Sequence, residues 1–359
     1  MKVGILGSGQ LGMMLAEAGR AIGVECLCYG PDTNPCAASA CEVIIGDFED
    51  QSKIRQLVER VDVITVESEH IPLSLLETLE KQTSLYPSSR AVGISQDRLK
   101  EKNFLESLHI PLPAYAAVDD VTMLRTLLHD RPGSYIVKTR LHGYDGKGQA
   151  LLNEIDQSEV VMDELGGKNL VAEEKVSFDR EVSIISARGR GGDICHYPLN
   201  ENIHRSGILR STRMINEPML QQQAESISER IMAELDYVGV LCVEYFDVGG
   251  QLLVNEVAPR VHNSGHITIE AASTSQFENH LRAITDIPLG SCKKQSNCAM
   301  LNIIGEEPDR AAIHIDSPYV YHAYNKQARP GRKLGHITVC DEDEARLINS
   351  VARLEKLLT

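Results

Sequence analysis

Two lysines and a glycine-rich loop make residues 135–149 the most chemically suggestive stretch of the chain. The segment is an apolar strand that ends in Lys138, followed by a loop with glycines at positions 143, 146 and 148 and with Lys147 between them. Glycine permits positive φ angles and lets the backbone approach a ligand closely. This pattern suits the gripping and covering of a polyphosphate, but a plain glycine-rich hairpin fits the local pattern equally well.

Two glutamates, Glu244 and Glu256, stand in otherwise apolar segments that predict a β-hairpin, Val238–Phe246 and Gln251–Val257. Each lies a few residues from the connecting turn, so the two side chains are expected to face each other across the ladder. Adjacent carboxylates repel unless a cation lies between them, and Mg²⁺, or Mn²⁺ in its place, prefers such oxygen ligands. The alternative is a solvent-facing pair, but the upstream lysine and glycine loop favour a metal site.

Hydrogen-bond donors and cations cluster after the second glutamate and again near the C-terminus. Arg260, His262 and residues 263–266 form the first group. The second places Lys326, Arg329, Arg332 and Lys333 within eight residues of an acidic chain. Guanidinium groups match a phosphate monoester, so the second group predicts a pocket for a substrate phosphate. A solvated surface loop is the alternative, which the Pro-Gly turn inside this group disfavours.

The elements that must position these residues follow two patterns. In the first, strands at Lys2–Leu6, Val24–Tyr29, Cys41–Gly46 and Val61–Glu67 alternate with helices at Leu11–Ile22, Ser52–Val58 and Leu73–Lys81, which predicts a doubly wound parallel sheet of about four strands. The second pattern predicts an α+β region. Its helices are expected at Gln96–Leu108, Val121–His129 and Met219–Leu235, and its strands at Asn169–Glu174, at Glu181–Ala187 and in the hairpin. The C-terminal part is predicted to hold strands at Met300–Ile304 and His336–Val339 and a closing helix, Glu342–Leu358. We therefore expect an α/β domain at 1–95, a second domain at 96–292 and a C-terminal region at 293–359.

The sequence Gly7-x-Gly9-x-x-Gly12 lies between a predicted strand and a predicted helix, with Asp32 about twenty residues further on. This pattern is typical of dinucleotide binding. However, about four strands are fewer than a dinucleotide fold usually has, and Asp32 follows Gly-Pro in a turn. We therefore favour a structural or substrate-facing turn over a site for NAD.

Composition excludes several classes of function. The chain has 359 residues, a net charge of −15 and no tryptophan, which argues against nucleic-acid binding. The nine cysteines form no C-x-x-C motif, so mostly buried free thiols in a reducing cytoplasm are expected. The sequence shows no signal peptide and no apolar run long enough for a membrane span.

Together these motifs resemble the ATP-grasp enzymes, and among them the N5-carboxyaminoimidazole ribonucleotide synthetase family of purine biosynthesis. The resemblance is carried by Lys138, the loop Gly-Tyr-Asp-Gly-Lys-Gly-Gln at 143–149, Asn-Glu-x-Ala-Pro-Arg-x-His-Asn-Ser-Gly-His at 255–266 and Arg-Pro-Gly-Arg-Lys at 329–333. It covers nearly the whole chain. It implies an ATP-grasp fold whose lid subdomain spans about 112–176.

The resemblance also implies site residues. The family's ATP contacts fall on Arg98, Lys138, Gly143, Tyr144, Asp145, Gly146, Lys147, Gly148, Gln149, Glu173, Glu174, Lys175, Val176, Glu181, His204, Asn255 and Glu256. Backbone groups of 173–176 would contact adenine, Glu181 would bind ribose, and Glu244 and Glu256 would bind Mg²⁺. The substrate side would comprise Tyr144, Asp145, Arg260, His262, Lys326, Arg332 and Lys333, with Lys147, Arg260 and His262 as catalytic residues.

The family's reaction consumes ATP, bicarbonate and 5-aminoimidazole ribonucleotide and proceeds through carboxyphosphate. A homodimer is expected because the family forms one, as is a hand-off to the mutase of the next step. Other hypotheses are a formate-dependent glycinamide ribonucleotide transformylase and a non-catalytic nucleotide-binding protein. The sequence departs from the family at Glu67-Ser68-Glu69-His70, where Glu-Phe-Glu-Asn is common, which puts in doubt only the local packing or a role for that loop.

Overall fold

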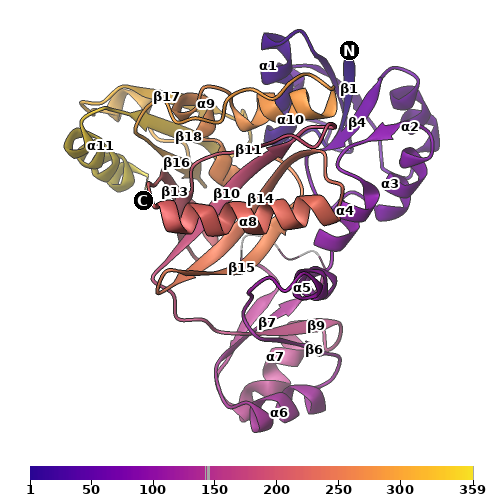
Figure 1. Cartoon of the computed structure of the whole chain (residues 1–359), viewed down its shortest axis with the longest axis vertical. Coiled ribbons are helices and arrows are strands. Elements are labelled where there is room, and N and C mark those ends of the chain that lie inside the picture. Colours follow the sequence, from indigo (N-terminus) through magenta and orange to yellow (C-terminus); the bar gives the residue numbers. More distant parts are fainter. Residues whose placement is uncertain (142, 144–145, 359) are drawn as a thin grey trace.

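The computed structural model describes residues 1–141, 143 and 146–358, which fold around three β-sheets (Figure 1). The N-terminal sheet is parallel and has five strands in the order β3 (Glu42–Ile45), β2 (Glu25–Gly30), β1 (Lys2–Leu6), β4 (Val63–Val66) and β5 (Ser84–Leu85). The four predicted strands are present. The fifth was not predicted, because a two-residue strand shows no periodicity.

Helices α1 (Gln10–Ala21), α2 (Gln51–Val58), α3 (Leu73–Glu80) and α4 (Ser89–Ser95) accompany this sheet. The helix predicted at 96–108 is confirmed as α5 (Arg98–Ser107), whereas α4, which ends at Ser95, was not predicted. Asp97 separates the two helices. Its side chain accepts hydrogen bonds from the N–H groups of Leu99 and Lys100, so it caps the second helix.

The large sheet holds nine strands and carries the predicted hairpin at one edge. Its order is β15 (Gln251–Ala258), β14 (Gly239–Val248), β10 (Arg180–Arg188), β12 (Asn200–Arg205), β13 (Ile208–Met214), β16 (Cys298–Ile304), β18 (Lys333–Cys340) and β17 (Tyr319–Ala323), with β11 (Ile194–His196) beside β10. The C-terminal strands therefore extend this sheet, and α11 (Glu344–Leu357) packs on β16 and β18.

Helices cover both faces of the large sheet, as Figure 1 shows for α8 (Pro218–Glu234) and α10 (Gln276–Ile284). Side chains alternate between the faces of a strand. Accordingly, Ile184 of β10 packs with Ile231 of α8, whereas the next residue, Ile185, packs with Leu281 of α10. The short helix α9 (Thr268–Ala271) lies near β18. These two hydrophobic clusters fix the sheet that carries both central glutamates.

The third sheet is small and antiparallel and lies beyond α5 at the lower end of the molecule (Figure 1). Its order is β6 (Tyr115–Val118), β9 (Leu170–Glu174), β7 (Tyr135–Thr139) and β8 (Gln149–Leu152), with α6 (Val121–Asp130) and α7 (Ser158–Glu164) packed on it. The glycine-rich loop joins β7 to β8. Short 3₁₀ turns lie at Cys36–Ser39, Ile155–Gln157, Asn263–Gly265 and Arg310–Ala312.

The expectation of free thiols was wrong for four of the cysteines. Cys195 is joined to Cys292 and Cys298 to Cys340, while Cys26, Cys28, Cys36, Cys41 and Cys242 are free. The second pair is explained by the sheet, because Cys298 and Cys340 are direct partners on β16 and β18. Strand register of this kind cannot be read from cysteine spacing. Within the described ranges, no helix is both long and apolar enough to cross a membrane.

Candidate active site

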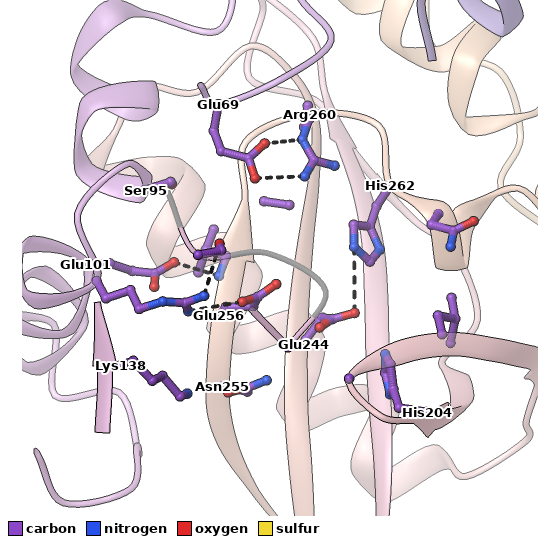
Figure 2. Close-up of a pocket in the computed structure, with 18 of the residues that line it drawn as sticks. Glu69, Ser95, Glu101, Lys138, His204, Glu244, Asn255, Glu256, Arg260 and His262 are labelled. Atoms are coloured by element: carbon purple, nitrogen blue, oxygen red, sulfur yellow. Dashed lines mark hydrogen bonds and ion pairs between the residues drawn. The ribbon is translucent and has the colours of Figure 1, made fainter. Parts of the chain in front are cut away.

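A cavity of about 610 Å³ lies where the three sheets approach one another. Its lining includes residues from the N-terminal sheet, from α5, from the β7–β8 hairpin and from the large sheet. Figure 2 shows Glu244 and Glu256 near its centre, with Lys138 on one side and the Glu69–Arg260 pair at the opposite end. Volumes of this size are typical of sites for small molecules. The cavity thus brings together residues more than 180 positions apart.

The two central glutamates face each other as predicted, because Glu244 on β14 is the direct ladder partner of Glu256 on β15. The register shifts at the next position, where Tyr245 pairs with Val254, so Asn255 is the extra residue of a β-bulge. Asn255 and Glu256 both line the cavity. Burial and the neighbouring charge of Glu256 raise the pKa of Glu244 to about 7. Two carboxylates this close repel each other unless positive charge lies nearby.

Lys138 lies at the end of β7 and its ammonium is 3.0 Å from a carboxylate oxygen of Glu173 on β9. The same oxygen is 3.2 Å from the ammonium of Lys102 on α5. Burial alone would raise the pKa of Glu173, but the two lysines hold it at about 2. Burial lowers the pKa of Lys138, and the charge of Glu173 opposes that effect. Lys138 is therefore anchored from behind while it lines the cavity.

Arg98, the first residue of α5, reaches into the cavity beside the glutamates. Its guanidinium is 3.4 Å from a carboxylate oxygen of Glu256 and donates a 3.2 Å hydrogen bond to the Gly143 carbonyl. On the far side of the cavity, His204 shares a 2.7 Å hydrogen bond with Glu181. Burial lowers the pKa of His204, but the bond to Glu181 together with the charges of Glu244, Glu181 and Glu256 outweighs burial and the pKa is raised. These predicted residues are thus brought together around the central pair.

Arg260 and His262 follow β15 and form the opposite end of the site. Arg260 makes a two-pronged ion pair with Glu69, in which Nη2 and Oε1 are 2.9 Å apart. Burial would raise the pKa of Glu69, but this pair lowers it to about 2. His262 bonds Ser264 through Nδ1 at 2.9 Å, and its Nε2 is 3.6 Å from Glu244. Burial and the charge of Arg260 lower the pKa of His262 well below its usual value, so the imidazole is neutral.

The glycine turn before α1 binds a carboxylate of the protein itself. Glu67, at the end of β4, accepts hydrogen bonds from the N–H groups of Gly9 (2.5 Å) and Gly12 (2.6 Å). Gly7 has a φ of +117°, and a Cβ there would overlap the Glu67 side chain. Glu67 therefore occupies the place that a dinucleotide phosphate would take. This finding contradicts NAD binding at the turn and gives the loop after β4 the role that the sequence left in doubt.

The β7–β8 loop closes one side of the cavity. Gly146 has a φ of +74°, and a Cβ there would lie 3.1 Å from Gly207 in the β12–β13 turn of the large sheet. At Gly148, a Cβ would lie 2.6 Å from the hydroxyl of Thr139. Gly143, Gly146 and Gln149 line the cavity, whereas Lys147 is exposed and does not. The predicted contacts of Tyr144 and Asp145 lie outside the described residues.

An apolar slot borders the cavity between the small and large sheets and was not predicted. Its walls are Ile136, Phe178, Leu209 and Phe246, with the two phenylalanine rings stacked 4.8 Å apart. The N–H groups of Glu174 and Lys175 donate to the carbonyls of Ala114 and Ser134. The prediction that other backbone groups of 173–176 contact a base stays a prediction. The apolar slot beside this segment offers a surface to a flat ring.

The basic tail, residues 326–333, is only partly in the cavity. Lys333 lines the cavity, whereas Lys326 and Arg332 do not belong to its lining. Burial and the charges of Arg332 and Lys333 lower the pKa of Lys326, which shows that the three cations are neighbours. Lys326 also donates to the side chain of Gln10 on α1. The tail thus forms a positive rim beside the glycine turn.

Several residues of the site were missed by sequence reasoning. Glu69, Glu101 and Lys102 gain their roles only from the packing of different elements. One signal was present for the last two. They follow Arg98 by three and four positions, so they share a face of one helix with a predicted site residue.

The fold and the cavity define an ATP-grasp enzyme, in which two sheets hold a nucleotide site between them. Family models bear this out, because the ATP-grasp domain matches residues 103–277 and the ribonucleotide synthetase preATP-grasp domain matches residues 1–96. The phosphoribosylaminoimidazole carboxylase C-terminal domain matches residues 298–350. The N5-carboxyaminoimidazole ribonucleotide synthase of Pseudomonas aeruginosa is 42% identical over 358 residues, which cover 100% of this chain and 99% of the relative. The chain belongs to the N5-carboxyaminoimidazole ribonucleotide synthase family, whose members are ATP-dependent ligases.

Solved structures agree with this family. The N5-carboxyaminoimidazole ribonucleotide synthetase of Thermus thermophilus is 42% identical, has a TM-score of 0.95, and is covered over 98% of its length by 99% of this chain. The N5-carboxyaminoimidazole synthase of Aspergillus clavatus, in complex with ADP and 5-aminoimidazole ribonucleotide, is 29% identical with a TM-score of 0.92. The coverage there is 99% of this chain and 98% of that protein. The predicted family and fold class are thus confirmed.

Proposed function

We propose that this chain carboxylates 5-aminoimidazole ribonucleotide with ATP and bicarbonate, giving N5-carboxyaminoimidazole ribonucleotide, ADP and phosphate in purine (IMP) biosynthesis. One observation carries the proposal. Glu244 and Glu256 face each other at the centre of a cavity that has Lys138 on one side and Arg260 on the other. A site of this kind can hold a polyphosphate at one end and an anionic acceptor at the other.

On the nucleotide side, phosphoryl transfer depends on positioning and on neutralising charge. Lys138 would hold the α- and β-phosphates, since its ammonium is aimed into the cavity and anchored by Glu173. Glu181 would accept hydrogen bonds from the ribose hydroxyls. The apolar slot that includes Phe178 and Phe246 would take the adenine ring.

The residues at the centre fit a divalent cation. Glu244 and Glu256 are direct ladder partners, and burial together with the charge of Glu256 raises the pKa of Glu244. They would hold Mg²⁺ with two protein carboxylates and leave its other positions to water and phosphate oxygens. When bound, the metal supplies charge neutralisation to the phosphates. Arg98, beside Glu256, adds a fixed positive charge to the same place.

On the acceptor side, Arg332, Lys333 and Lys326 would bind the ribonucleotide phosphate. Bicarbonate would be held by Arg260 or by residues 263–266. A bicarbonate oxygen attacks the γ-phosphorus and ADP leaves; the exocyclic amine then takes the carboxyl group and phosphate leaves. His262 is neutral, so its imidazole is in a state to accept the proton that the amine loses.

The loop at 143–149 would act as a lid over the reaction. The proposal is supported by Gly146, where an added Cβ would lie 3.1 Å from Gly207 in the β12–β13 turn of the large sheet. Closure excludes water from a mixed anhydride that water would destroy. In this proposal Lys147, Tyr144 and Asp145 act from the lid on the phosphates and the acceptor.

Further proposals concern organisation. The domains are assigned to 1–95, 96–292 and 293–359, with the lid subdomain at about 112–176. A homodimer, a cytoplasmic location and a hand-off of the product to the next enzyme stay predictions. Size-exclusion chromatography with light scattering measures the first of these directly.

The test measures ADP release with Mg²⁺ and ATP while 5-aminoimidazole ribonucleotide and bicarbonate are omitted in turn. ADP formation that requires both substrates, together with transfer of ¹³C from bicarbonate to the product, supports the proposal. ADP formation that requires formate and glycinamide ribonucleotide instead would reassign the acceptor. Nucleotide binding without any turnover would identify a non-catalytic protein.

A further inference from the structure

Helix α5 presents three charged side chains to the nucleotide side of the site. Arg98, Glu101 and Lys102 are spaced by three and four positions, so they share one face of the helix. Glu101 is 3% exposed and Lys102 is 1% exposed. Charged side chains this deeply buried need partners. Those partners show what the helix does.

The first set of partners is the backbone of β15, the edge strand of the large sheet. An edge strand has N–H and C=O groups that no neighbouring strand can pair. Lys102 donates a 2.7 Å hydrogen bond to the carbonyl of Asn255, and Glu101 accepts a 2.7 Å bond from the N–H of Val257. The two side chains therefore hold the residues on either side of Glu256.

The bulge makes this support necessary. Asn255 is the extra residue between the pairs Glu244–Glu256 and Tyr245–Val254, so its position is not set by the β14 ladder. Without Lys102, its carbonyl would lose its charged donor in a buried place. The orientation of Asn255 and Glu256 toward the cavity is thus fixed by helix α5, which lies outside the sheet.

The second partner of Lys102 is Glu173, whose oxygen lies 3.2 Å from Lys102 and 3.0 Å from Lys138. Glu173 belongs to β9 and Lys138 to β7, both in the small sheet. Lys102 is therefore bonded to the large sheet through Asn255 and to the small sheet through Glu173. It does not line the cavity itself.

We propose that Lys102 is a positioning residue of the ATP site, which holds the strand of the metal ligand Glu256 and the phosphate-binding Lys138 in a fixed relation. The proposal rests on the assignment of those two residues under the proposed function. Lys102 acts through the Asn255 carbonyl and through Glu173 and touches no substrate. Groups that orient the ligands of a metal typically change affinity or activity about 10- to 100-fold when removed.

The test is Lys102→Met, which keeps the length of the side chain and removes its charge and its donors. The Glu173–Lys138 pair remains after this substitution. We expect the affinity for Mg²⁺–ADP, measured by calorimetry, to fall about tenfold or more, and the Mg²⁺ concentration for half-maximal binding to rise. The affinity for 5-aminoimidazole ribonucleotide is expected to stay within about twofold. The matched control is Lys100→Met, on the exposed side of the same helix.

A second variant, Glu173→Gln, separates the two links and serves if Lys102→Met does not fold. It removes the ion pairs of Glu173 with Lys102 and Lys138 but leaves the bond from Lys102 to the Asn255 carbonyl, so nucleotide affinity should fall while the Mg²⁺ requirement stays the same. Unchanged nucleotide affinity in either folded variant would overturn the proposal, as would an equal loss of affinity for the acceptor. Binding is measured without turnover, so a wild-type protein that binds Mg²⁺–ADP but does not carboxylate would refute the proposed reaction alone.

Discussion

Two pairs of carboxylates lie in the same cavity and differ in what satisfies them. Glu67 and Glu69, in the loop after β4, have their partners within the protein: two backbone N–H groups and a guanidinium. Glu244 and Glu256 face each other, with the guanidinium of Arg98 at 3.4 Å from only one of them. The first pair forms part of the wall of the site. The second pair carries negative charge that a bound cation would balance.

The pKa values of Glu69 and Glu244 show this difference, whereas burial raises the pKa of Glu67 despite its two backbone donors. That of Glu69 is lowered to about 2, whereas that of Glu244 is raised to about 7, although both side chains are mostly shielded from water. Burial acts in the same direction on both, so the partner decides the outcome. A carboxylate whose charge is balanced by a partner within the protein contributes to stability. A carboxylate without such a partner is suited to binding a ligand.

The substitution Glu256→Gln is the strongest test of this difference between the two pairs of carboxylates. We expect the rate of ADP formation to fall about a thousandfold or more, because a metal ligand supplies several kcal/mol to the reaction and each 1.4 kcal/mol is a factor of ten. The melting temperature should change little, because the repulsion between Glu244 and Glu256 and the ion pair of Glu256 with Arg98 are lost together. Glu77→Gln, at an exposed position of α3, is the control. Turnover close to that of the control would remove Glu256 from the site.

Glu69→Gln tests the other pair and should show the reverse balance. It leaves Arg260 buried without its counter-ion, which costs about 3 kcal/mol of stability. Chemical denaturation measures this loss. Steady-state kinetics should show an increase in the KM for 5-aminoimidazole ribonucleotide with little change for ATP, because Arg260 lies on the acceptor side. If a stable variant showed a raised KM for ATP instead, Glu69 would belong to the nucleotide side of the cavity and this prediction would be wrong.

The stability contributed by Glu69 has a defined pH dependence. Its pKa is about 2 in the folded protein against an ordinary value of 4.5. A group whose pKa is lowered by folding stabilises above the unfolded value, and the contribution is lost as pH falls toward the folded value. The difference in melting temperature between the wild type and Glu69→Gln should therefore be constant above about pH 5 and shrink between pH 4.5 and 2. A difference that grows on acidification would contradict the ion pair.

The sequence predicted site residues well where they belong to one hairpin or strand, and poorly where they come together from different elements. The facing of Glu244 and Glu256 followed from a hairpin with a recognisable turn, and Lys138 from a strand that runs into glycines. Glu69, Lys102 and the apolar slot come from loops and helices that lie side by side only in the folded chain. No spacing in the sequence encodes those contacts.

The same limit applies to the fold. Alternating strands and helices indicated the parallel sheet, whereas the two-residue strand β5 and the break at Asp97 depend on local hydrogen bonds. The disulfide between Cys298 and Cys340 depends on the pairing of β16 with β18. At Gly7–Gly12 the favoured prediction of a structural turn holds, because the turn binds an internal glutamate rather than a dinucleotide.

The smallest expected effect is that of Arg332→Ala, which tests how far the acceptor end of the cavity extends. Arg332 does not line the cavity, but it neighbours Lys326 and Lys333 and donates to the Gln327 carbonyl at 3.1 Å. If the three cations bind the ribonucleotide phosphate, removing one should raise the KM for that substrate about tenfold and leave the KM for ATP unchanged. Arg353→Ala, on α11, controls for the loss of a surface charge. An unchanged KM would limit the phosphate site to Lys326 and Lys333. The acceptor end of the cavity would then extend no further than the residues beside the glycine turn and Glu67.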